Sequence, residues 1–124
     1  MKVALPFIKR DEAKDGVRIF ETEDRAVELD NTLVAQMRWE AAFPELAKRE
    51  SIIDYAERVK DAPSGSVAVL IARLKVLYCF FKMPCTFEDF LAMFDWSQKE
   101  YAERLVNAIK EAFDLIFGTA SEKN

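Results

Sequence analysis

The chain has 124 residues, of which 51% are hydrophobic and 32% are charged. This length suits one compact domain, and the composition excludes both a disordered chain and a membrane protein. The net charge is −4 and both signs are interspersed, without the clustered basic stripe that follows a phosphate backbone, so we expect no binding to nucleic acid.

The sequence contains no histidine and only two cysteines, Cys79 and Cys85. Ser-His-Asp and Cys-His nucleophilic arrangements are therefore impossible, and the spacing of the cysteines is not that of a zinc site. We expect both thiols to be reduced and structural. Adjacent carboxylates such as Glu88 and Asp89 point in different directions on a helix and do not form an acid/base pair. We expect no enzymatic activity, no metal and no cofactor.

The first 29 residues differ in pattern from the rest. Apolar and polar residues alternate over Val17–Glu21, a polar segment follows at Thr22–Arg25, and Ala26–Leu29 is again partly apolar. This pattern predicts a short β-hairpin that turns at Thr22–Arg25, which would be marginal unless it packed against something. The apolar run at residues 3–8 is too short for a signal peptide, so we expect no export.

From Asp30 onward the pattern is helical. Asp30–Thr32 is typical of a helix start, and the helix that follows should end near Phe43, because a residue before proline is disfavoured in the helical conformation. Pro44 can begin a second helix with an apolar stripe as far as Val59. A break of this second helix near Ser51 is the alternative to one continuous helix.

A long apolar helix is predicted after the loop Asp61–Ser66 and extends to Phe81. Several of its faces are apolar, so we expect neighbours on nearly all sides. A membrane span needs about 20 mostly apolar residues. Arg73 and Lys75 interrupt the apolar run near its middle, which indicates a core helix.

Two capping patterns predict the remaining helix starts. Thr86 is followed three residues later by Asp89, and Ser97 is followed by Glu100, as in a capping box. Trp96 precedes the second pattern and is expected to pack there as a hydrophobic staple.

These elements predict a mainly α fold, a single domain of about five helices, with a possible short N-terminal β-hairpin that would make it α+β. The expected organisation is an N-terminal segment at residues 1–29, a helical domain at residues 30–118 that ends at Gly118, and a flexible tail at residues 119–124.

Aromatic residues suggest where a partner binds. Five of the ten phenylalanines lie between residues 77 and 94, and large aromatic side chains dominate the energetics of cores and interfaces. The aromatic content exceeds what a five-helix core obviously needs. We take Trp39, Phe43, Phe113 and Phe117 as candidate anchors for a partner. For Trp39, packing against the central helix is the favoured interpretation and partner contact is the alternative.

Four segments carry a family resemblance through their order and spacing. They are Arg38–Pro44, Ile52–Ala56, Leu77–Phe80 and Phe87–Leu91. Over roughly residues 27–124 the chain resembles the small tail assembly chaperones of long-tailed, siphovirus-type phages and prophages of Gram-positive bacteria.

The resemblance implies a role in virion morphogenesis in the cytoplasm of the bacterial host. Such chaperones coat the long helical tape measure protein before tail tube protein polymerises around it, by binding a helix in a groove. The implied partners are tape measure protein, tail tube protein and a frameshift-extended form of the chain, with a homo-oligomer also open and no membrane partner. The alternatives are a small helical adaptor or regulatory protein and a phage structural connector.

Overall fold

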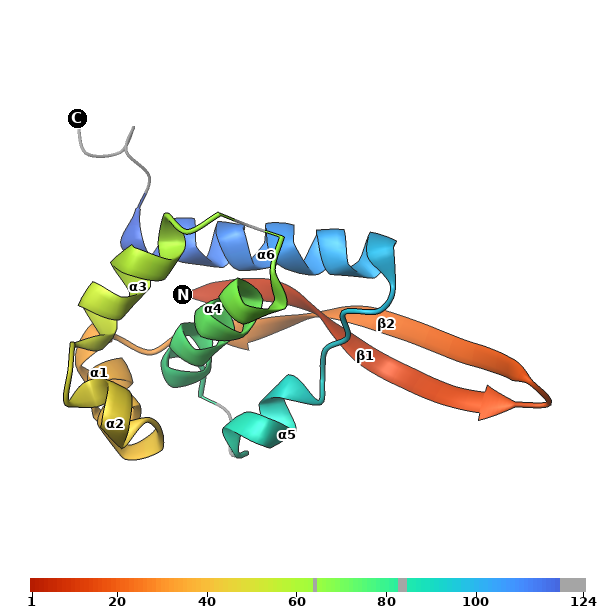
Figure 1. Ribbon diagram of the computed structural model, residues 1–124, viewed down its shortest axis with the longest axis horizontal. Helices are drawn as coiled ribbons and strands as arrows, with labels where there is room; N and C mark the ends of the chain where they lie inside the picture. Colours follow the sequence, from red (N-terminus) through yellow and green to blue (C-terminus); the bar gives the residue numbers. More distant parts are fainter. Residues whose placement is uncertain (64, 83–84, 119–124) are drawn as a thin grey trace.

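The computed structural model describes residues 1–63, 65–82 and 85–118. Within them, a two-stranded hairpin precedes six helices (Figure 1). The elements are β1 (Lys2–Lys14), β2 (Val17–Glu28), α1 (Thr32–Ala42), α2 (Pro44–Ala47), α3 (Ile52–Lys60), α4 (Val67–Phe80), α5 (Phe87–Leu91) and α6 (Lys99–Phe117). The predicted tail at residues 119–124 lies outside the described residues.

The fold is α+β, and the prediction of a mainly α fold with about five helices is wrong. The predicted helix that begins at Pro44 is two helices, α2 and α3. They are separate because the Ser51 hydroxyl accepts a hydrogen bond from the Asp54 backbone N–H and so begins a new helix. The hairpin is also much longer than predicted, with strands of 13 and 12 residues.

The hairpin turns at Asp15 and Gly16, where φ is 53° and 76°. This is the left-handed conformation that an Asp-Gly pair adopts readily in a two-residue hairpin turn. The predicted turn at Thr22–Arg25 is wrong, because these residues lie inside β2 and pair with Leu5–Ile8 of β1. An irregularity between Ile8 and Arg10 leaves one extra residue on β1, whereas β2 is continuous.

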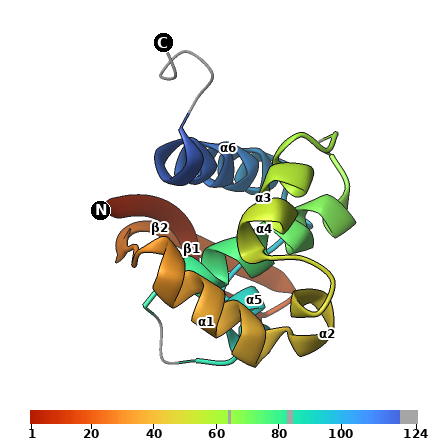
Figure 2. The ribbon, with the colours of Figure 1, turned by 90° about the vertical axis from the view of Figure 1, so that its left-hand side faces the viewer.

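β1 lies between α6 on one side and the α5 region on the other (Figures 1 and 2). On the α6 side, the Tyr101 hydroxyl donates a 2.6 Å hydrogen bond to the Pro6 carbonyl. On the other side, the rings of Phe7 and Phe94 are 5.1 Å apart, and the Ile8 N–H donates to the Met93 carbonyl at 2.9 Å. The inner half of the hairpin is thus part of the hydrophobic core.

α4 is the centre of the helical part and packs against α1, α3, α5 and α6. Arg73 of α4 is 8% exposed and donates to the carbonyls of Val59, Lys60 and Ala62 at 3.0–3.3 Å. This guanidinium satisfies carbonyl groups that the end of α3 leaves without helical partners. In the described part of the chain, no helix is long and apolar enough to cross a membrane.

One of the two predicted helix starts is confirmed. The Thr86 hydroxyl accepts from the Asp89 N–H at 3.1 Å and begins α5. The predicted start at Ser97 is wrong, because α6 begins after Gln98, whose side chain makes no cap hydrogen bond. The Ser97 hydroxyl instead donates to the Asp95 carboxylate at 2.8 Å.

Candidate partner-binding groove

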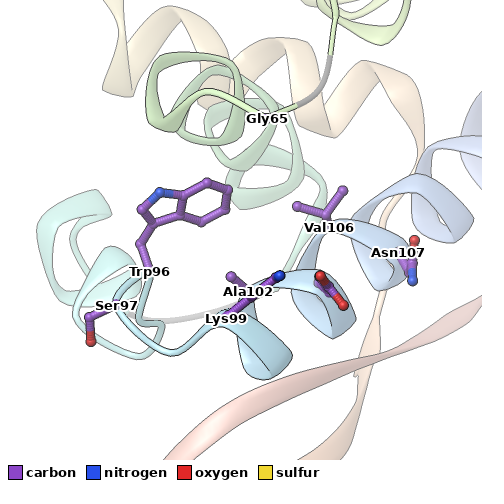
Figure 3. A pocket seen from close by; sticks show the side chains of 8 residues that line it. Gly65, Trp96, Ser97, Lys99, Ala102, Val106 and Asn107 are labelled. Carbon is purple, nitrogen blue, oxygen red and sulfur yellow. The ribbon is translucent and has the colours of Figure 1, made fainter.

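An open groove lies between the start of α4, the α5–α6 connection and the N-terminal half of α6. It consists of two hollows of about 780 and 220 Å³, and the indole of Trp96 lines both. Figure 3 shows this indole between Gly65 and α6, with Val106 and Ala102 on the opposite wall. Trp96 is partly exposed, so part of a large aromatic ring is available to a partner.

The walls of the groove are largely apolar and its rim is polar. The smaller hollow is lined, besides Trp96, mainly by apolar side chains of α4 and of the α5 region: Val67, Leu70, Ile71, Leu74, Leu91 and Phe94. Lys99, Glu103 and Asn107 follow one another at intervals of four along α6 and form an exposed edge of the larger hollow. An apolar interior with a polar edge is the surface that an amphipathic helix requires.

Hydrogen bonds hold the connection that carries Trp96. The Asp95 carboxylate accepts from the Ser97 N–H at 3.2 Å, from the Ser97 hydroxyl at 2.8 Å and from the Gln98 N–H at 3.3 Å. Arg18 of the hairpin donates to the Ser97 hydroxyl at 3.1 Å and lies 3.7 Å from the Asp95 carboxylate. The indole is therefore presented by a preorganised turn, which lowers the entropy cost of binding.

The structure places the four predicted anchor residues mainly in the core. Trp39 is 0% exposed and donates its indole N–H to the Glu50 carbonyl at 3.1 Å, and Phe113 is 2% exposed. These two side chains are not available to a partner in this conformation. Phe43 and Phe117 are partly buried, and their rings lie 5.4 Å from Trp39 and 5.5 Å from Phe113, respectively. The four residues thus form two separate pairs, one at the C-terminal end of α1 and one on α6.

Trp96 was not among the four residues that the sequence analysis took as candidate anchors. The sequence analysis expected this side chain to pack as a staple before Ser97. In the structure Trp96 packs against the core and also lines a groove built from segments far apart in the sequence. The available signal was a tryptophan in a connection between two helices, outside either apolar stripe.

α1 carries a second exposed apolar surface. Leu33 is 82% exposed and Met37 is 66% exposed, and these residues lie one turn apart on the same face of the helix. Ala41 continues this line and is also exposed. The opposite face of α1 buries Ala35 and Trp39, so α1 is apolar on two sides.

The titratable groups with shifted pKa values lie outside the groove walls. Burial raises the pKa of the Cys79 thiol to about 12 and also raises the pKa of Cys85, so neither thiol is activated as a nucleophile. The hydrogen bonds from Arg18 hold the pKa of the exposed Asp11 carboxyl below its ordinary value.

Among the described residues, no group of three or more His, Cys, Asp or Glu side chains is placed to hold a metal ion.

Comparisons of the chain with protein-family models, with curated proteins and with solved structures find no match. The geometry of the groove and the resemblance of the four sequence segments are therefore the grounds for a functional proposal.

Proposed function

We propose that the protein is a phage tail assembly chaperone, which binds and shields an amphipathic helix of the tape measure protein and hands it over to tail tube protein. The observation that supports this most is the open apolar groove with Trp96 at its centre. The sequence resemblance supplies the identity of the partner, and the groove supplies a surface on which one of its helices would fit.

The physical requirement is that binding be selective for apolar helices and yet reversible. Burying one large apolar side chain stabilises a complex by about 1.5–3 kcal/mol. Two or three such contacts supply about 3–9 kcal/mol, which is comparable with the cost of association of about 4–15 kcal/mol. The groove alone should therefore bind weakly, so a polymerising protein could displace it. The apolar pair Leu33 and Met37 on α1 offers a further contact for a long partner that extends beyond the groove.

Co-expression with the tape measure protein of the same phage tests the proposal. The readouts are the soluble fraction of the tape measure protein and the amount that co-purifies. The wild-type chain should keep the partner soluble, and Trp96→Ala should reduce co-purification by about tenfold or more, the loss typical of a hot-spot residue. Val106→Asp, which places a carboxylate in the groove, should have the same effect.

Leu115→Ala is the matched control. Leu115 also lies on α6 and is 50% exposed, but it does not line the groove, so this variant should bind as the wild type does. Circular dichroism checks that each variant is folded. A folded Trp96→Ala variant with undiminished capture would reject the groove as the site.

The chaperone function would be rejected in favour of an adaptor if neither the wild-type chain nor its frameshift-extended form captured the tape measure protein. Assembly into rings without any partner would indicate a structural connector.

A further inference from the structure

The outer edge of β2 is open. In the part of the chain that the structure describes, the sheet has two strands, and β2 pairs only with β1. About half of the backbone N–H and C=O groups of β2 therefore point away from the sheet and are available to another strand. The outer half of the hairpin also extends beyond the helices (Figure 1), so an added strand could approach it.

β1 is protected at its edge and β2 is not. Pro6 of β1 has no N–H, its carbonyl accepts from Tyr101, and the Ile8 N–H is bonded to Met93. Proline, bulges and lysine are the features that usually prevent a strand edge from pairing. β1 has all three, whereas Val17–Glu28 contains no proline, glycine or lysine and no irregularity.

The side chains of β2 are strongly acidic in its second half. Four carboxylates lie within eight residues, with Glu21 and Glu23 on one face of the strand and Asp24 and Glu28 on the other, and all four residues are exposed. Arg25 is the only basic residue of this stretch, and its guanidinium lies 4.2 Å from the centre of the Phe7 ring.

Three of these carboxylates already contact cations of the chain. Glu21 pairs with Arg10 at 3.2 Å, Glu23 with Arg25 at 3.8 Å and Glu28 with the N-terminal amine at 3.3 Å. Exposed pairs of this kind contribute little to stability and exchange readily with other cations. The acidic edge therefore remains able to attract a basic partner.

We propose that β2 docks an extended segment of a partner protein as a third strand of the sheet, with lysine or arginine at alternate positions opposite Asp24 and Glu28. These two carboxylates share one face of β2, whereas Arg25 lies on the face of Glu21 and Glu23 and would repel a basic segment there. Backbone hydrogen bonds supply the attachment, and cross-strand pairs with the carboxylates select basic sequences. A second copy of β2 is disfavoured as the occupant, because it would bring the same carboxylates against each other. This site uses other residues than the groove and does not depend on the proposed function.

The test uses capped peptides and the full chain labelled with ¹⁵N. The probe is a peptide of alternating lysine and valine. The first comparison peptide has glutamate in place of lysine, and the second has the lysines but a central proline that removes a backbone donor. Amide hydrogen exchange and chemical shifts locate the binding, and fluorescence anisotropy of labelled peptides measures affinity at low ionic strength.

The lysine peptide should slow the exchange of outward-facing amides in Val17–Glu28, the glutamate peptide should not bind, and the proline peptide should bind more weakly. The double variant Asp24→Asn, Glu28→Gln removes both carboxylates of one face and should weaken the binding of the lysine peptide by about threefold to tenfold. Glu57→Gln with Glu111→Gln removes two exposed carboxylates on helices and is the matched control.

Three results would overturn the proposal. Equal binding of the lysine and proline peptides would show charge attraction without strand addition. Shifts confined to the Trp96 groove, or no binding at all, would remove the edge as a site. Concentration-dependent protection of β2 without peptide would make a second copy the occupant.

Discussion

Replacement of Tyr101 by phenylalanine tests how α6 is attached to the hairpin. Tyr101 is 4% exposed, and its hydroxyl makes the 2.6 Å hydrogen bond to the Pro6 carbonyl. Phenylalanine keeps the edge-on ring contact with Phe20, at 5.5 Å between centroids, but leaves that carbonyl without its donor. We expect Tyr101→Phe to lower the free energy of unfolding by about 1–3 kcal/mol at pH 7, the usual cost of a lost partner for a buried polar group.

The same substitution has a pH signature. Burial raises the pKa of Tyr101 from 10.0 to about 12. Because the pKa is higher in the folded than in the unfolded state, the stabilisation is fully present below pH 10 and is lost as the pH rises through 12. One pKa unit corresponds to about 1.4 kcal/mol. At pH 11 the wild type should therefore have lost about 1.4 kcal/mol through this residue, and Tyr101→Phe should have lost none of it.

Urea unfolding followed by far-ultraviolet circular dichroism at pH 7 and pH 11 measures the difference between the two proteins. Other groups that titrate in this range act equally on both, so the difference isolates Tyr101. It should shrink by about 1.4 kcal/mol at the higher pH. A difference that is the same at both pH values, or zero at pH 7, would refute the reasoning that the hydroxyl is a buried neutral donor.

Two further predictions concern buried groups. In native protein at pH 8, a thiol reagent should modify Cys85 slowly and Cys79 only after unfolding. The reason is that Cys79 is 0% exposed and that burial raises its pKa to about 12. Equal rates of modification for both thiols would contradict this prediction. In urea titrations, Arg73→Met should lower the free energy of unfolding by about 2–4 kcal/mol, since the carbonyls at the end of α3 lose a charged donor. The control Lys75→Met, on the same helix, should lower it by less than about 1 kcal/mol. Similar losses for both variants would show that Arg73 has no special role.

Most of the helical structure could be predicted because its signals are local. Asn31, Ser51, Ser66 and Thr86 each cap the helix that follows through a side-chain oxygen. The end of α1 at Phe43 follows from the proline after it. Such features depend on neighbours within four residues, so the sequence displays them directly.

The hairpin and the groove could be predicted only in part. The Asp15–Gly16 turn signal was present, but the mixed polarity of β1 beyond Ile8 hid the first strand, and the polar segment Thr22–Arg25 resembled a turn. β2 keeps these polar residues because the side chains of Glu23, Asp24 and Arg25 are exposed to water. The groove needs the relative placement of α4, the α5–α6 connection and α6, which no local pattern contains.

The packing of β1 against α6 determines when the chain can finish folding. The hydrogen bond between Tyr101 and Pro6 joins residues that are 95 positions apart. Contacts of such long separation slow folding, since a large loop must close before they form. During synthesis, Val3, Leu5 and Phe7 are made before α6, and they lack one of their covering elements until α6 has left the ribosome. The apolar face of β1 is therefore the surface most in need of protection in the growing chain.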